Sequence, residues 1–149
     1  MSDKKADTLK TTQYSNFTLI DLLSIILLVG LIFVFVVPVH QAKISRDRVN
    51  EALTTLRMIG EKTVEFKNDP ANGDYPVDIS QLNLGDKIKS NYFEYSVVPE
   101  DSTIVAETTQ AFGKKGAFLV YSLSGKQFRI GKNDSDVESQ KFINENWLP

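Results

Sequence analysis

Hydrophobic residues divide the chain into two parts that follow different patterns. From Leu22 to Ala42 the sequence carries no charged residue and consists largely of leucine, isoleucine, valine and phenylalanine. A helix rises about 1.5 Å per residue, so about 20 such residues cross a hydrocarbon core roughly 30 Å thick. This run therefore predicts a membrane-spanning helix near the start of the chain.

Beyond this run the apolar residues adopt helical spacing. They recur at Ala42, Val49, Leu53, Leu56, Ile59, Thr63 and Phe66. Steps of three, four and seven residues place them on one stripe of a helix, which needs a partner to cover it. Because no turn signal separates the stripe from the apolar run, we expect one helix over residues 17–67, ending at Asn68-Asp69-Pro70. Pro38 lies inside this helix and predicts a kink, since proline lacks an N–H and clashes with the preceding turn.

The residues after this helix predict a short helical turn followed by strands. Asp78 is a candidate cap for a turn that buries Ile79 and Leu82. Strands are expected at Tyr92–Val98, Thr103–Thr108, Ala117–Leu123 and Lys126–Ile130, with a hairpin turn at Ser124-Gly125. The C-terminal Trp147-Leu148-Pro149 is expected to dock on the sheet. A long helix followed by an antiparallel meander predicts an α+β fold.

Asp21 is an acidic residue at the start of the apolar run. A charge at the centre of a membrane helix costs about 2.5–3.5 kcal/mol on insertion scales, so such a residue normally has a function. The alternative is a plain anchor whose Asp21 lies in the headgroup zone. A secretory signal peptide is disfavoured, because no small-residue cleavage site follows the run.

The segment Asn16-Phe17-Thr18-Leu19-Ile20-Asp21-Leu22, with Gly30, Pro38 and Gln41 at matching distances, resembles the start of type IV pilins and type II secretion pseudopilins. The family pattern is a short basic leader ending in glycine, then Phe-Thr-Leu-Ile-Glu-Leu, an apolar run and a proline near its end. This chain departs from the pattern at two positions. Asn16 stands where the family has glycine, and Asp21 stands where it has glutamate.

The resemblance implies a pilin-like fold with a leader over residues 1–16, a transmembrane and filament-core helix over 17–42, and a globular head over 43–149. It implies that a prepilin peptidase cuts between Asn16 and Phe17 and methylates the new amine of Phe17. Asp21 would then meet the Phe17 amine of a neighbouring subunit during assembly.

The function implied by the resemblance is that of a structural subunit of a type IV pilus-like filament. A type II secretion pseudopilin is the alternative within the class. The partners would be copies of the chain or other pilins, the peptidase, an inner-membrane assembly platform and, before assembly, membrane lipid. The chain would first be a single-pass protein of the bacterial inner membrane with a cytoplasmic N-terminus, and later part of a periplasmic or extracellular filament.

Composition and motifs narrow the remaining chemistry. The formal net charge of −2 gives no strong field for nucleic acid, so no nucleic-acid partner is predicted. The absence of cysteine excludes disulfides and thiolate metal sites, and the single histidine, His40, is expected at the membrane interface. The sequence lacks a nucleophile elbow, a phosphate loop and a zinc-protease motif, so neither an enzyme nor a cofactor is expected.

The acidic segment Asp134–Glu138 places oxygen ligands at alternating positions, which a calcium site can use. The alternative is a solvated acidic loop, because no glycine follows the acids as in tight calcium-binding loops. A membrane-anchored binding module that never polymerises, with its sheet serving a ligand, is the alternative of another functional class.

Overall fold

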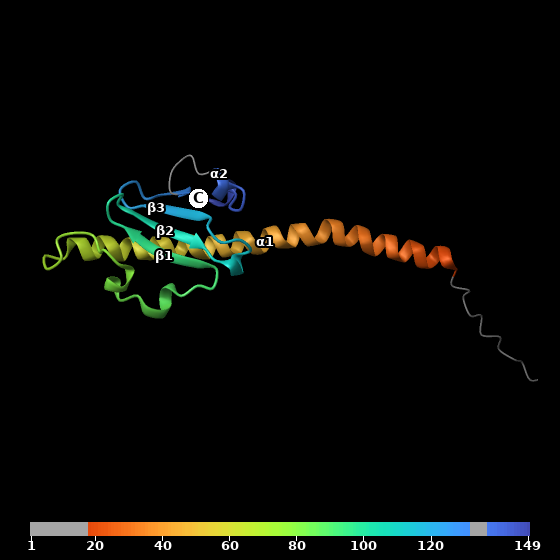
Figure 1. Cartoon of the computed structure of the whole chain (residues 1–149), viewed down its shortest axis with the longest axis horizontal. Helices are drawn as coiled ribbons and strands as arrows, with labels where there is room; N and C mark the ends of the chain where they lie inside the picture. The colour runs from red at the N-terminus through yellow and green to blue at the C-terminus, as the bar shows by residue number, and fades with distance from the viewer. Residues whose placement is uncertain (1–17, 132–136) are drawn as a thin grey trace, which may run out of the picture. The chain divides into compact units, whose positions relative to one another are not determined.

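The computed structural model of the chain describes residues 18–131 and 137–149. Its first element, α1 (Leu19–Asn68), is a helix of 50 residues that agrees with the one predicted over 17–67 (Figure 1). The helix runs through Pro38, which has no N–H and so leaves the carbonyl one turn before it without its helical partner; the kink stays a prediction. The chain divides into two compact units, residues 1–40 and 41–149, and α1 contributes to both.

The end of α1 is closed by the residues that follow it. Pro70 cannot continue a helix because it has no N–H to donate. The side-chain amide of Asn72 donates a hydrogen bond of 3.2 Å to the carbonyl of Phe66 in the last turn, which also accepts one of 3.3 Å from the Asp69 amide. Lys67 lies in that turn, and its ammonium is 3.9 Å from the centroid of the Tyr75 ring. These contacts fix the loop that leaves the helix.

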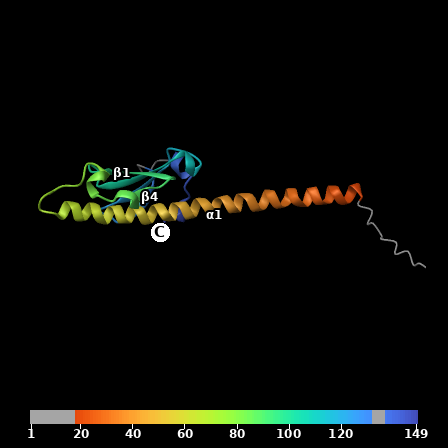
Figure 2. The same cartoon turned by 90° about the horizontal axis from the view of Figure 1, so that it is seen from below.

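Four antiparallel strands form one sheet in the order β1-β2-β3-β4. Their bounds are Phe93–Val98 for β1, Thr103–Thr108 for β2, Phe118–Ser122 for β3 and Gln127–Ile130 for β4. The register places Tyr95 opposite Ala106 and Leu119 opposite Ile130. Figure 2 shows the sheet along one side of the second half of α1. The predicted α+β arrangement and all four predicted strands are confirmed.

The hydrophobic core of the second unit lies between the sheet and α1. The buried residues of α1 are Val49, Ala52, Leu53, Leu56, Ile59, Gly60 and Thr63. They face buried strand residues such as Phe93, Ile104 and Leu119. The predicted stripe is confirmed from Val49 to Thr63, and Phe66 is half-buried. The prediction for Ala42 is wrong: this residue is exposed, since the cover that buries the stripe begins only at Val49.

Gly60 allows α1 and β3 to approach each other closely. A Cβ atom added at Gly60 would lie 2.5 Å from Cε1 of Tyr121 and 3.4 Å from Cδ2 of Leu123. The Tyr121 ring is buried and packs on Phe128, with the two ring centroids 4.7 Å apart. A residue with a side chain at position 60 would therefore push against the buried ring of Tyr121.

Short helical turns connect the main elements. They are η1 (Ile79–Leu82), η2 (Gly85–Ile88), η3 (Gln110–Phe112), α2 (Val137–Gln140) and η4 (Glu145–Trp147). Asp78 caps η1 as predicted, since its carboxylate accepts a hydrogen bond of 2.7 Å from the Ser80 amide. Leu82 is buried and Ile79 is half-buried.

Trp147 and Leu148 of the C-terminal segment pack against the core, which α1 and the sheet form together, whereas Pro149 is exposed; docking on the sheet itself stays a prediction. Two further contacts hold the segment in place. Ile143 is fully buried, and the Ser139 hydroxyl accepts a hydrogen bond of 3.1 Å from the amide of Phe118 at the start of β3. The C-terminal segment is therefore a structural part of the second unit.

Candidate functional site

The first turn of α1 contains a capping box built by Thr18 and Asp21. The Asp21 carboxylate accepts hydrogen bonds from the Thr18 amide at 2.9 Å and from the Thr18 hydroxyl at 2.7 Å. In return, the Asp21 amide donates to the Thr18 hydroxyl oxygen at 3.3 Å. Such reciprocal bonds satisfy amides that have no partner within the helix. The negative charge of an acid in the first turn also interacts favourably with the positive end of the helix dipole. Asp21 thus has a local structural role at the start of α1.

This role of Asp21 was missed in the sequence, although a signal for it was present. Thr18 and Asp21 form the pattern Thr-x-x-Asp directly before an apolar run, which is typical of a capping box. Both hydrogen bonds to the carboxylate use Oδ2. Among the residues described by the structure, Oδ1 accepts no hydrogen bond and Asp21 forms no ion pair, so one carboxylate oxygen is available to a partner.

The side chains of the apolar run are exposed on every side of α1. Each valine, leucine, isoleucine and phenylalanine from Leu19 to Val39 keeps at least 40 % of its surface exposed. The hydroxyl of Ser24, a polar residue in this run, donates a hydrogen bond of 2.8 Å to the carbonyl of Ile20, so its proton is bonded within the helix itself. The helix is long and apolar enough to cross a membrane.

Several predicted site residues lie outside the described part of the chain. Asn16 and Phe17 are among them, so the cleavage site and the amine of Phe17 have no position. Of the proposed calcium segment, residues 134–136 also lie outside. Its last residue, Glu138, is 3.6 Å from the ammonium of Lys114, which in turn lies 4.3 Å from the centroid of the Phe142 ring. Glu138 therefore has a partner within the fold.

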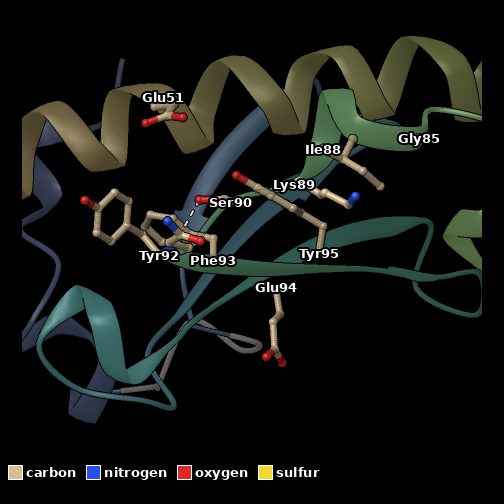
Figure 3. Close-up of a pocket in the computed structure, with 10 residues that line it drawn as sticks. Glu51, Gly85, Ile88, Lys89, Ser90, Tyr92, Phe93, Glu94 and Tyr95 are labelled. Atoms are coloured by element: carbon tan, nitrogen blue, oxygen red, sulfur yellow. Dashed lines mark hydrogen bonds between the residues drawn. The ribbon is translucent and has the colours of Figure 1, made fainter.

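A groove of about 600 Å³ lies in the second unit between α1, η2 and β1. Figure 3 shows Tyr95 pointing from β1 toward the helix and Glu94 pointing away from it, to the other side of the sheet. The Ser90 hydroxyl accepts a hydrogen bond of 3.2 Å from the Tyr92 amide, and Lys89 pairs with Asp86. Several polar groups of the groove are thus engaged in contacts of the head itself.

Tyr95 carries the perturbed ionisable group of this groove. Burial raises the pKa of its phenol above the ordinary value of 10.0, and the negative charge of Glu51 acts in the same direction. Hydrogen bonding by the Thr55 and Ser90 side chains favours the ionised form and opposes this rise in pKa. The phenol is therefore neutral at physiological pH and serves as a polar contact between β1 and α1.

The described residues contain no group of three or more histidine, cysteine or acidic side chains that could hold a metal ion.

No protein-family model matches the chain, and no curated protein matches it either. Two features remain that can act on other molecules. One is the exposed apolar half of α1 with Asp21 in its first turn, and the other is the surface of the head.

Proposed function

We propose that the chain is the structural subunit of a type IV pilus-like filament, made as a membrane protein and processed before Phe17. The observation that carries the proposal is the division of α1. Its first half exposes apolar side chains all round, and its second half buries one stripe under its own sheet. A surface this apolar needs cover from lipid or from other helices. A filament subunit uses both, lipid before assembly and neighbouring helices afterwards.

Asp21 supplies the specific contact in this proposal. After cleavage, Phe17 carries an amine whose reference pKa is near 8, so it is positive at neutral pH. Burying either charge alone among packed helices costs several kcal/mol, whereas pairing them offsets much of this cost. An incoming subunit is then favoured in the one axial position that brings its amine to a free Asp21 oxygen. A pseudopilin of a type II secretion system uses the same contacts in a different machine.

A membrane-anchored binding module is the second candidate, and the groove beside Tyr95 favours it. Its volume of about 600 Å³ lies within the range of small-molecule sites, about 300–1,000 Å³. Such a protein remains in the membrane fraction, whereas a filament subunit is released as fibres by shearing. The location of the mature chain after shearing distinguishes the two functions.

The assembly role of Asp21 is tested by filament yield in sheared fractions at matched membrane levels. Asp21→Asn retains a side-chain acceptor for the cap but removes the charge, and the neighbouring amine is left unpaired at a cost of about 3–5 kcal/mol. Because 1.4 kcal/mol is a factor of ten in affinity, we expect Asp21→Asn and Asp21→Ala to reduce filaments about a hundredfold or more. Asp21→Glu, in contrast to these two variants, keeps the negative charge and is expected to form filaments.

Thr18→Ala is the matched control, because it weakens the cap and leaves the Asp21 charge in place. Loss of a capping residue costs about 0.5–2 kcal/mol and affects mainly the first turn of the helix. We therefore expect filaments from Thr18→Ala. Normal yield from Asp21→Ala would refute the pairing role, and equal losses from Thr18→Ala and Asp21→Asn would show that Asp21 acts only as a cap.

A further inference from the structure

Val77 is an exposed apolar side chain held on a rigid turn. In the described part of the second unit, the large apolar side chains that are exposed are Val77, at 79 %, and Val64, at 38 %. Pro76, directly before Val77, is buried. The amides of Val77 and Asp78 both donate to the side-chain oxygen of Gln81, at 2.7 and 3.1 Å. An apolar group fixed in this way loses little conformational freedom when it binds.

The other exposed valine lines a small apolar groove. The groove has a volume of about 220 Å³ and lies between α1 and the end of β3. Its apolar lining comes from Gly60, Val64, Tyr121 and Leu123, with Glu61 and Lys126 also at the groove. Because Gly60 has no side chain, the Tyr121 ring and Leu123 approach the helix and form part of the wall. The groove is large enough for one branched aliphatic side chain.

We propose that Val77 of one copy of the chain inserts into this groove of a second copy. Asp78 follows Val77, and the groove carries one residue of opposite charge to it, Lys126 at the β3–β4 turn, besides Glu61 on α1. Neither Asp78 nor Lys126 forms an ion pair with another described residue. Lys126 can therefore pair with Asp78 of the incoming copy. The occupant is a second copy because the same chain carries both the side chain and its receptor.

The positions of the two features define the kind of assembly. Val77 lies directly before Asp78, the N-cap of η1, and η1 contacts β1 at one edge of the sheet. The groove lies at the β3–β4 turn, toward the other edge. A contact between different surfaces of identical subunits is heterologous, and it adds copies without limit unless the rotation closes a ring. The inference rests on the proposed filament function and names a contact between the globular parts of neighbouring subunits within it.

The chain contains no cysteine, so paired cysteines introduced into the full-length protein test the contact directly. Val77→Cys is combined with Val64→Cys, and membranes and sheared fractions are treated with a mild oxidant before non-reducing electrophoresis. We expect a ladder of dimers, trimers and longer species, because each copy then carries both halves of the contact. The control pair is Lys115→Cys with Val64→Cys, since Lys115 lies in the exposed turn before β3, at the other end of that strand.

A disulfide needs two Cβ atoms within about 4.5 Å, so we expect at least about tenfold more ladder from the test pair than from the control pair. Equal crosslinking by the two pairs would overturn the proposal. Dimers from Val77→Cys alone at the yield of the test pair would overturn it too, because they would indicate a symmetric contact. If Val64→Cys lowers the amount of folded protein, Lys126→Cys replaces it at the groove, with the same expectations.

The same samples separate this proposal from the filament function. Fibres without a ladder would leave the filament in place and overturn the contact between Val77 and the groove. A ladder in membranes without fibres would support the contact and count against the filament.

Discussion

Replacing Gly60 with alanine changes the free energy of unfolding through two opposing effects, and the structure indicates which of them is larger. Alanine is favoured over glycine inside a helix by about 1 kcal/mol. Against this, the new Cβ would lie 2.5 Å from Cε1 of Tyr121. Tyr121 has only 7 % of its surface exposed and its ring packs on that of Phe128, so a shift of the ring would disturb this contact. Overpacking of this kind costs about 1–3 kcal/mol, which leaves an expected net loss of about 1 kcal/mol.

The assay is thermal unfolding of a fragment that begins at Lys43, monitored by circular dichroism. A loss of 1 kcal/mol lowers the Tm of a domain of about 100 residues by about 4 °C or more. The decisive control is the same substitution in a Tyr121→Leu background, where the ring is gone and only the helix preference remains. There Gly60→Ala is expected to raise the Tm. An equal effect in both backgrounds, or a rise in the original one, would refute the close approach.

Three further predictions follow from the sequence and the core. Intact-mass analysis of sheared filaments is expected to show chains that begin at a methylated Phe17, with Asn16→Gly speeding maturation; filaments of chains that begin at Met1 would contradict this. Leu56→Asp places an unpaired charge at a fully buried position and is expected to unfold the fragment, so an unchanged Tm would disprove the stripe. Because the pKa of Tyr95 is raised on folding, its stabilising contribution is complete below pH 10.0 and declines as pH rises above that value. Tyr95→Phe is expected to remove this part of the alkaline loss in the unfolding free energy.

Periodicity predicted most of the fold because it depends on local geometry alone. The helical spacing of Val49, Leu53, Leu56 and Ile59 defines one face whatever covers it. The same spacing gave a wrong result at Ala42, since a pattern along a helix does not show where the covering sheet begins. Gly60 was missed for a related reason: a glycine has no apolar side chain, and its burial follows from the approach of β3.

The candidate site was predictable only in part. The sequence marked Asp21 through its acidic charge beside an apolar run, but the partner considered for it was an amine on another chain. The structure adds a partner within the same turn, Thr18, whose amide and hydroxyl reach the carboxylate. The exposed turn at Val77 and the groove at Val64 had no signal in the sequence. Each depends on which residues the folded head leaves uncovered.

The capping box changes how the pairing of Asp21 is understood. A carboxylate on a free side chain would lose rotamer freedom when it met an amine, and this loss would weaken the contact. Here the bonds to Thr18 already hold one oxygen of Asp21, so the second oxygen occupies a defined place at the helix end. Aspartate fits this geometry with a side chain one methylene shorter than that of glutamate. Under the proposed assembly, the cap thus prepares Asp21 for pairing, and the incoming amine has to reach an acceptor whose position the helix sets in advance.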